Sequence, residues 1–274
     1  MTMSQDEKAR RFRALHDRPG AFVIPNPWDA GSARMLAALG FEALATTSAG
    51  FAFSLGRRDG AVTRDEALDH ARSIVAAADL PVSADLENCF GDAPATVAET
   101  IRLAAATGLV GASVEDATGD ASRPIYEFAA AVERVAAAVA AARALPFSFI
   151  VTARAENFLQ GRRDLPDTIR RLEAFAAAGA DVLYAPALPD LAAVSAVCAA
   201  VAPRPVNVLA GAPAFTVANL AAAGVRRISL GGLLARAAYG AMLRAGREIA
   251  ETGTFAFAGD AASFAEISGF MAGR

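Results

Sequence analysis

The chain has 274 residues, of which 54% are hydrophobic and 20% charged, so it can form a sizeable core in one large or two small domains. Its formal net charge is −3 and it has no basic cluster, which argues against a nucleic acid partner. The polar N-terminus does not resemble a secretory signal and no apolar run reaches the roughly 18 residues of a membrane helix, so we expect a cytoplasmic protein without membrane contact.

Short apolar runs alternate with alanine-rich stretches eight times along the chain. The runs typical of strands are 21–26, 43–49, 81–87, 111–117, 148–156, 180–187, 205–211 and 226–232. The stretches typical of helices are 29–40, 63–79, 95–108, 126–145, 165–179, 190–201, 216–224 and 232–253. Apolar strands that alternate with amphipathic helices predict a parallel sheet covered by helices.

Eight such repeats predict the α/β class and a closed (β/α)8 TIM-type barrel. We expect a single domain over residues 1–274, with a C-terminal helical tail over about 233–274. A doubly wound open sheet is the second possibility. It is disfavoured because no glycine-rich fingerprint follows the first strand.

Lysine, histidine and cysteine are scarce, and this excludes several mechanisms. Lys8 is the only lysine, so a Schiff-base enzyme would lack its nucleophile at a strand end. His16 and His70 are the only histidines and fall outside the strand ends, which disfavours a zinc site or a Ser-His-Asp triad. Cys89 and Cys198 are too few for a disulfide framework.

Acidic side chains gather where active sites of this fold lie, at the C-terminal ends of the strands. Asp85 and Glu87 stand two positions apart, so an extended strand would turn both to one face. Glu115 ends the next strand and should converge with them. Three carboxylates repel one another unless a cation neutralises them, and oxygen ligands suit Mg2+ or Mn2+. The alternative is that these acids cap helices or pair with Arg154.

Hydroxyl groups and a further acid accompany the second strand. Thr47 and Ser48 would present hydroxyls and backbone N–H groups suited to a substrate carboxylate. Asp59, in the loop that follows, is aimed at the same region.

The chain resembles the isocitrate lyase and phosphoenolpyruvate mutase superfamily from about residue 12 to 258. The segments that carry the resemblance are NPWDAGSARMLAALGFEALATTSAGFAFSLGRRDG, VSADLENCFG, GASVEDA, IVTARAEN, GADVLYAPAL, PVNVLAG and RRISLGGLLARAAYGA. The resemblance implies a barrel whose eighth helix is swapped between subunits, in a homo-oligomer that is a dimer or a tetramer.

The resemblance also implies roles for individual residues. Mg2+ (or Mn2+) would bind at Asp85, with Glu87 and Glu115 holding it directly or through water. Arg154, Asp59 and Glu115 match catalytic positions, and the residues that would bind substrate are Thr47, Ser48, Asp85, Arg154 and Asn207. Several groups can act as general acid or base: Glu156, Tyr184, Cys89 or a metal-bound water.

One segment departs from the resemblance. Residues 117–125 lack the Lys-Lys-Cys-Gly-His motif of isocitrate and methylisocitrate lyases, and they also lack the lysine and asparagine of the mutase lid.

Three functions are therefore considered. The first is an Mg2+-dependent lyase that breaks a C–C bond of a small 2-oxo or 2-hydroxy (di)carboxylic acid. The second is a hydrolase or mutase acting on the P–C bond of phosphonopyruvate. The third is a protein that binds a 2-oxo acid such as 2-oxoglutarate with little catalysis.

Overall fold

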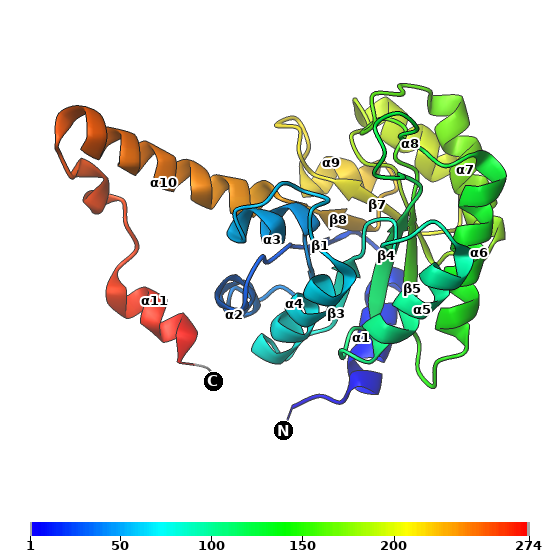
Figure 1. Cartoon of the computed structure of the whole chain (residues 1–274), viewed down its shortest axis with the longest axis horizontal. Helices are drawn as coiled ribbons and strands as arrows, with labels where there is room; N and C mark the ends of the chain where they lie inside the picture. The colour runs from blue at the N-terminus through cyan, green and yellow to red at the C-terminus, as the bar shows by residue number, and fades with distance from the viewer. Residues whose placement is uncertain (1, 273–274) are drawn as a thin grey trace.

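Eight parallel strands form one sheet in the computed structural model, which describes residues 2–272. Its order is β1-β8-β7-β6-β5-β4-β3-β2 (Figure 1). The strands are β1 (Phe22–Ile24), β2 (Leu44–Ala45), β3 (Val82–Asp85), β4 (Gly111–Glu115), β5 (Ile150–Arg154), β6 (Val182–Tyr184), β7 (Val206–Leu209) and β8 (Arg227–Ser229). The Ala45 N–H donates to the Pro25 carbonyl at 3.0 Å, which joins β2 to β1 and closes the barrel.

Helices follow the strands and cover the barrel. They are α1 (Gln5–Asp17), α2 (Ala30–Ala38), α3 (Ser48–Ser54), α4 (Arg64–Ala77), α5 (Pro94–Ala105), α6 (Phe128–Arg143), α7 (Leu165–Ala177), α8 (Leu191–Ala200), α9 (Val217–Ala222), α10 (Leu233–Thr252) and α11 (Phe264–Met271). A 3-10 turn spans Ala256–Gly259. Within residues 2–272, no helix is both long and apolar enough to cross a bilayer.

All eight expected strands are present, so the barrel is confirmed and the open sheet is wrong. The second strand is much shorter than the expected 43–49 because the chain turns into α3. Thr47 caps that helix, its Oγ1 accepting from the Gly50 N–H at 3.2 Å. The expected tail ends at residues 273–274, which lie outside the described residues.

Side chains alternate between the barrel interior and the surrounding helices, as strand geometry requires. Val82 and Val151 point outward and pack in the main apolar core against the helices. Ile150 and Val182, near the strand starts, pack in a second apolar cluster that also contains residues of α1. The interior is thus apolar near the starts of β5 and β6, whereas Arg227 at the start of β8 donates to Thr152 Oγ1 at 2.9 Å within a buried polar network.

Helix α1 closes the N-terminal end of the barrel (Figure 1). Ser4 and Glu7 form a capping box that starts the helix. Ala9, Phe12 and Leu15 belong to the second apolar cluster, so this face of α1 seals the bottom of the barrel.

Helix α10 extends away from the barrel, and α11 returns toward α2 (Figure 1). Ala235 is the buried residue of α10 in the described chain, whereas Met242 and Leu243 are exposed. Arg34 of α2 donates to the Met271 carbonyl at the end of α11. The exchange of α10 between subunits stays a prediction.

A substitution at Gly111 tests how tightly the interior of the barrel is packed. A Cβ added there would lie 2.9 Å from the Ile150 carbonyl oxygen and 3.0 Å from the Phe12 ring. We expect Gly111→Ala to lower the free energy of unfolding by about 1–3 kcal/mol, since overpacking forces backbone shifts. Gly211→Ala is the matched control, because its added Cβ meets nothing within 4 Å. Chemical denaturation of both variants checks this, and equal stabilities would contradict it.

Candidate active site

Asp85, the last residue of β3, is held by four residues from three neighbouring segments. Its Oδ1 accepts from Arg154 Nη1 at 2.9 Å and from Ser113 Oγ at 3.3 Å. Its Oδ2 accepts from the Ser48 N–H at 3.3 Å and Oγ at 3.1 Å. Its own N–H donates to Thr46 Oγ1 at 2.9 Å. The carboxylate is therefore fixed at the C-terminal mouth of the barrel.

Arg154 joins the carboxylates of three residues around one guanidinium. Besides Asp85, its Nη2 lies 3.2 Å from Glu115 Oε2 and its Nε 2.7 Å from Glu156 Oε1. The guanidinium also stands 5.0 Å from the centroid of the Tyr184 ring. Strand register explains the meeting, because Glu115 pairs with Arg154 and Arg154 with Tyr184.

A second buried ion pair supports the ends of β4 and β5 from the outer side. Asp116 Oδ1 accepts from the Glu156 N–H at 2.8 Å, and Asp116 Oδ2 lies 3.0 Å from Arg171 Nη1. Arg171 also donates to the Tyr126 carbonyl at 3.1 Å. This network positions the backbone from which Glu115 and Glu156 project.

The site holds more acidic groups than a single arginine can neutralise. Burial raises the pKa of Glu115, and the charges of Glu156, Asp85 and Glu87 raise it further against the opposing effect of Arg154. Burial also raises the pKa of Glu156, with smaller contributions from the charges of Asp85 and Asp59. Burial raises the pKa of Glu87 to about 7, and the Asp85 and Asp59 charges add to this rise. The pKa of Asp59 is raised by partial burial and by Asp85.

The backbone at Glu87 differs from the expected extended strand. β3 ends at Asp85, and Glu87 has a φ of 49°, in the left-handed region. The prediction placed Asp85 and Glu87 on one face of a single extended strand. That strand does not include Glu87, so this part of the prediction is wrong. Glu87 still reaches the site, because its Oε2 lies 3.9 Å from a Cβ built at Gly60, beside Asp59.

The donor set suits a hard divalent cation. Asp59, Asp85, Glu87, Glu115 and Glu156 are oxygen donors whose mutual repulsion a cation would relieve. Within residues 2–272, no three His, Cys, Asp or Glu side chains already form a group that could hold an ion. Asp85 and Glu115 instead converge on Arg154. A cation at Asp85 would therefore reach Glu87 and Glu115 through water or after a side-chain movement.

Asn207 lies apart from the carboxylates, one strand beyond Tyr184. Its Oδ1 accepts from Arg227 Nε at 2.8 Å, and its Nδ2 donates to Ser229 Oγ at 2.9 Å. The side chain is buried within this interior network. Its role in binding substrate stays a prediction.

Sequence reasoning missed two polar residues of the site, Ser113 and His70. Ser113 binds Asp85, as Thr46 does, and the two-residue spacing from Ser113 to Glu115 would have indicated the shared interior face. His70 stacks on Phe51, with ring centroids 3.9 Å apart, and lines a recess together with Asp85 and Glu87. Its position within a helix gave no such signal.

Cys89 does not line the mouth. The side chain is fully buried, and burial raises the pKa of its thiol to about 12. Tyr184 is nearly as enclosed, and burial raises its pKa to about 12 as well. Neither group is ionised at neutral pH.

Removal of Arg154 tests the charge balance. A carboxyl group whose pKa is raised by folding stabilises the fold below its unfolded pKa, and this contribution is lost as the pH rises toward the folded pKa. Arg154→Met should raise the pKa of Glu115 and Glu156 further, because a positive charge is lost. We expect a loss of about 3–5 kcal/mol at pH 8 and a smaller loss at pH 5.

Thermal and denaturant unfolding at both pH values measure this effect. Arg64→Met is the control, because the Arg64–Glu99 pair is exposed and worth no more than about 1 kcal/mol. An Arg154 variant as stable as this control at pH 8 would show that the carboxylates do not depend on the guanidinium.

Comparison with known proteins places this geometry in a family. A sequence profile for phosphoenolpyruvate phosphomutase matches residues 12–250. A Burkholderia cenocepacia J2315 protein, provisionally assigned as a lyase or mutase, has a crystal structure that is 61% identical, with a TM-score of 0.95 over 98% of this chain and 96% of that one.

Two characterised enzymes are more distant. The 2-methylisocitrate lyase of Bacillus subtilis is 31% identical over 195 residues, which are 68% of this chain and 62% of the enzyme. An oxaloacetate acetylhydrolase in complex with oxalate is 26% identical, with a TM-score of 0.87 over 97% of this chain and 94% of that one. The chain thus belongs to the isocitrate lyase and phosphoenolpyruvate mutase superfamily.

Proposed function

We propose that the protein is an Mg2+-dependent lyase that cleaves a C–C bond of a small 2-oxo or 2-hydroxy dicarboxylic acid. The observation that carries the proposal is the cluster of carboxylates around the single guanidinium of Arg154. Two of the relatives support it, since one is a lyase and the other acts on oxaloacetate.

Asp85 would hold the cation, with Glu87 and Glu115 completing the site through water. When bound, Mg2+ supplies positive charge against the substrate oxygen that becomes negative as the C–C bond breaks. The Ser48 N–H and hydroxyl, with Thr47 beside them, would bind one substrate carboxylate. Arg154 would bind the other end, where its fork can pair with a carboxylate in place of Asp85.

Asp59 and Glu115 are the groups we assign to proton transfer. Both have a raised pKa, and a general acid or base works best when its pKa is near the working pH. They face the cluster from different segments, since Asp59 lies in the loop before α4 and Glu115 ends β4. Asn207 would bind substrate from the opposite wall of the barrel, where its hydrogen bond to Ser229 positions the side chain.

The activity test uses oxaloacetate and 2-methylmalate with Mg2+, corrected for cleavage by the metal alone. We expect turnover that EDTA abolishes and that Asp85→Ala lowers at least about 100-fold in kcat/KM, as when a charge-stabilising group is removed. Asp65→Ala, which removes a carboxylate exposed on α4, is the matched control. Turnover that survives EDTA would exclude the metal. Stabilisation by a 2-oxo acid without any product would instead indicate a binding protein.

A P–C hydrolase or mutase is the second candidate, because the matching family profile is that of phosphoenolpyruvate phosphomutase. The segment that would cover such a substrate is held by an antiparallel bridge between Ala117 and Ile125. This segment, residues 117–125, contains neither lysine nor asparagine. Its one arginine, Arg123, lies 3.8 Å from the Asp92 carboxylate. Phosphorus NMR of phosphonopyruvate incubated with the enzyme distinguishes the two candidates, since only P–C chemistry yields phosphate or phosphoenolpyruvate.

We also propose a dimer or tetramer in which α10 packs on a second subunit. Met242 and Leu243 expose 60% and 51% of their surface, and they line an apolar groove with Phe53 and Tyr239. Large exposed apolar groups gathered in one place mark an interaction surface. We expect a multimer in sedimentation and its dissociation in Met242→Glu/Leu243→Glu, whereas Arg72→Glu on α4 should leave it intact. A monomeric wild type would contradict the exchange of α10.

A further inference from the structure

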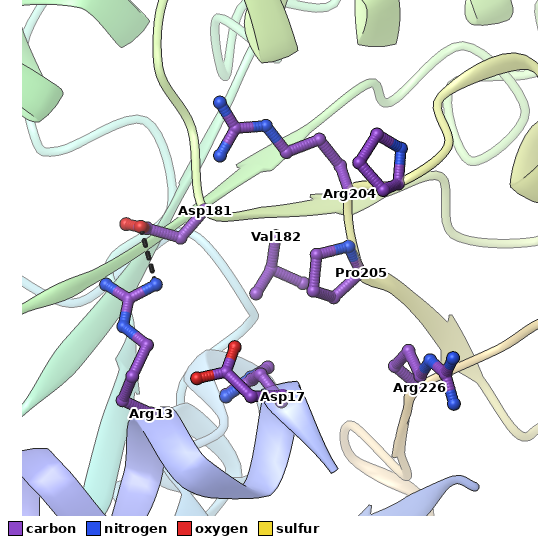
Figure 2. A pocket seen from close by; sticks show the side chains of 9 residues that line it. Arg13, Asp17, Asp181, Val182, Arg204, Pro205 and Arg226 are labelled. Atoms are coloured by element: carbon purple, nitrogen blue, oxygen red, sulfur yellow. Dashed lines mark hydrogen bonds and ion pairs between the residues drawn. The ribbon is translucent and has the colours of Figure 1, made fainter. Parts of the chain in front are cut away.

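A second cavity opens at the N-terminal end of the barrel, opposite the carboxylate cluster. Its volume is about 490 Å3, within the range of roughly 300–1,000 Å3 typical of small-molecule sites. Figure 2 shows the side chains that line it, among them Arg13, Asp17, Asp181, Arg204 and Arg226. This end of a TIM barrel ordinarily serves stability, so three arginines around one cavity are unexpected there.

The Asp181 carboxylate is occupied by contacts within the fold, so its charge does not neutralise Arg204 and Arg226 of the cavity. Its Oδ1 lies 2.9 Å from Arg13 Nη1 and 2.8 Å from Arg143 Nη2, and its Oδ2 accepts from the Val151 N–H at 2.9 Å. Arg13 also donates to Ser148 Oγ at 3.2 and 3.3 Å. The buried carboxylate therefore pairs with two arginines. Its contact with Arg13, drawn in Figure 2, fixes the position of that side chain.

Arg204 and Arg226 supply charge that remains available to a ligand. In the described chain, residues 2–272, neither has an acidic partner, and Arg226 makes one long hydrogen bond, 3.4 Å, to the Gly20 carbonyl. Arg204 stands between Pro203 and Pro205, whose rings fix the backbone φ on each side of it. The guanidinium is thus presented from a rigid turn, which lowers the entropy lost on binding.

The remaining walls of the cavity are neutral apart from Asp17. His16 is buried, and burial together with the Arg227 charge lowers its pKa to about 3, so the ring is neutral at physiological pH. Its Nδ1 donates to the Phe12 carbonyl at 2.8 Å, which fixes the tautomer. Asp17 supplies acceptor oxygens at the wall, and the two prolines and Val182 supply apolar surface.

We propose that this cavity binds a small multivalent oxyanion, either an organic phosphate or a polycarboxylate, that also carries a hydroxyl group. Arg204 and Arg226 would bind the oxyanion, because a guanidinium fork matches phosphate and carboxylate oxygens bidentately. Asp17 would accept from the hydroxyl group. The ligand would touch the starts of β6, β7 and β8, at Val182, Pro205 and Arg226.

Isothermal titration calorimetry with ADP and with citrate, each in EDTA, tests this site apart from the metal-dependent chemistry. We expect binding of at least one probe that Arg204→Ala/Arg226→Ala weakens at least tenfold. The control Arg72→Ala/Arg102→Ala removes two arginines from the outer helices α4 and α5 and should keep the affinity. Binding of ADP alone identifies organic phosphates, and binding of citrate alone identifies polycarboxylates.

Three results would overturn the proposal. The first is an absence of binding by both probes at millimolar concentration. The second is an unchanged affinity in Arg204→Ala/Arg226→Ala, with circular dichroism showing that this variant is folded. The third is a loss of binding in folded Arg154→Met, because that would place the anion at the carboxylate cluster. Failure of the C–C cleavage assay leaves all three results interpretable, since none requires turnover.

Discussion

The ion pairs of Arg154 are the interaction on which the mouth of the barrel depends. Asp85, Glu115 and Glu156 all turn toward this guanidinium, and two of these carboxylates have a raised pKa even in its presence. Burying so many like charges is costly unless each is paired and hydrogen-bonded. The residual excess of negative charge would favour the cation that we propose, and Arg154 offsets part of that charge.

At both ends of the barrel, side chains alternate between the interior and the surrounding helices, but the kinds of interior side chain differ. At the N-terminal end, Phe12 of α1 packs in one apolar cluster with Ile150 and Val182, and it fills the space that Gly111 leaves free. At the C-terminal end the interior positions carry Asp85, Glu115 and Arg154. Apolar packing is therefore concentrated at one end and the carboxylate cluster lies at the other, with the arginine-lined cavity as the exception to the first.

Much of the fold could be predicted from the sequence, because strand and helix periodicities repeat eight times and agree with a single architecture. Asp85, Glu115 and Arg154 could be predicted as neighbours because parallel strands end at a common edge. Pairing of the two acids with Arg154 was the alternative that the sequence left open, and the register of β4 with β5 brings Glu115 and Arg154 together. The backbone conformation of Glu87 was predicted wrongly, because hydrophobic periodicity does not indicate a left-handed φ. The N-terminal cavity was missed because Arg13 and Arg204 are distant in sequence.

The hydrogen bond from Arg13 to Asp181 spans 168 positions of the chain. Contacts of such long range make folding slow, because a large loop must close before they form. During synthesis, α1 emerges before every strand of the barrel, yet the apolar cluster that its face joins is complete only when Val182 of β6 has emerged. The docking of α1 therefore depends on residues that are made much later in the chain.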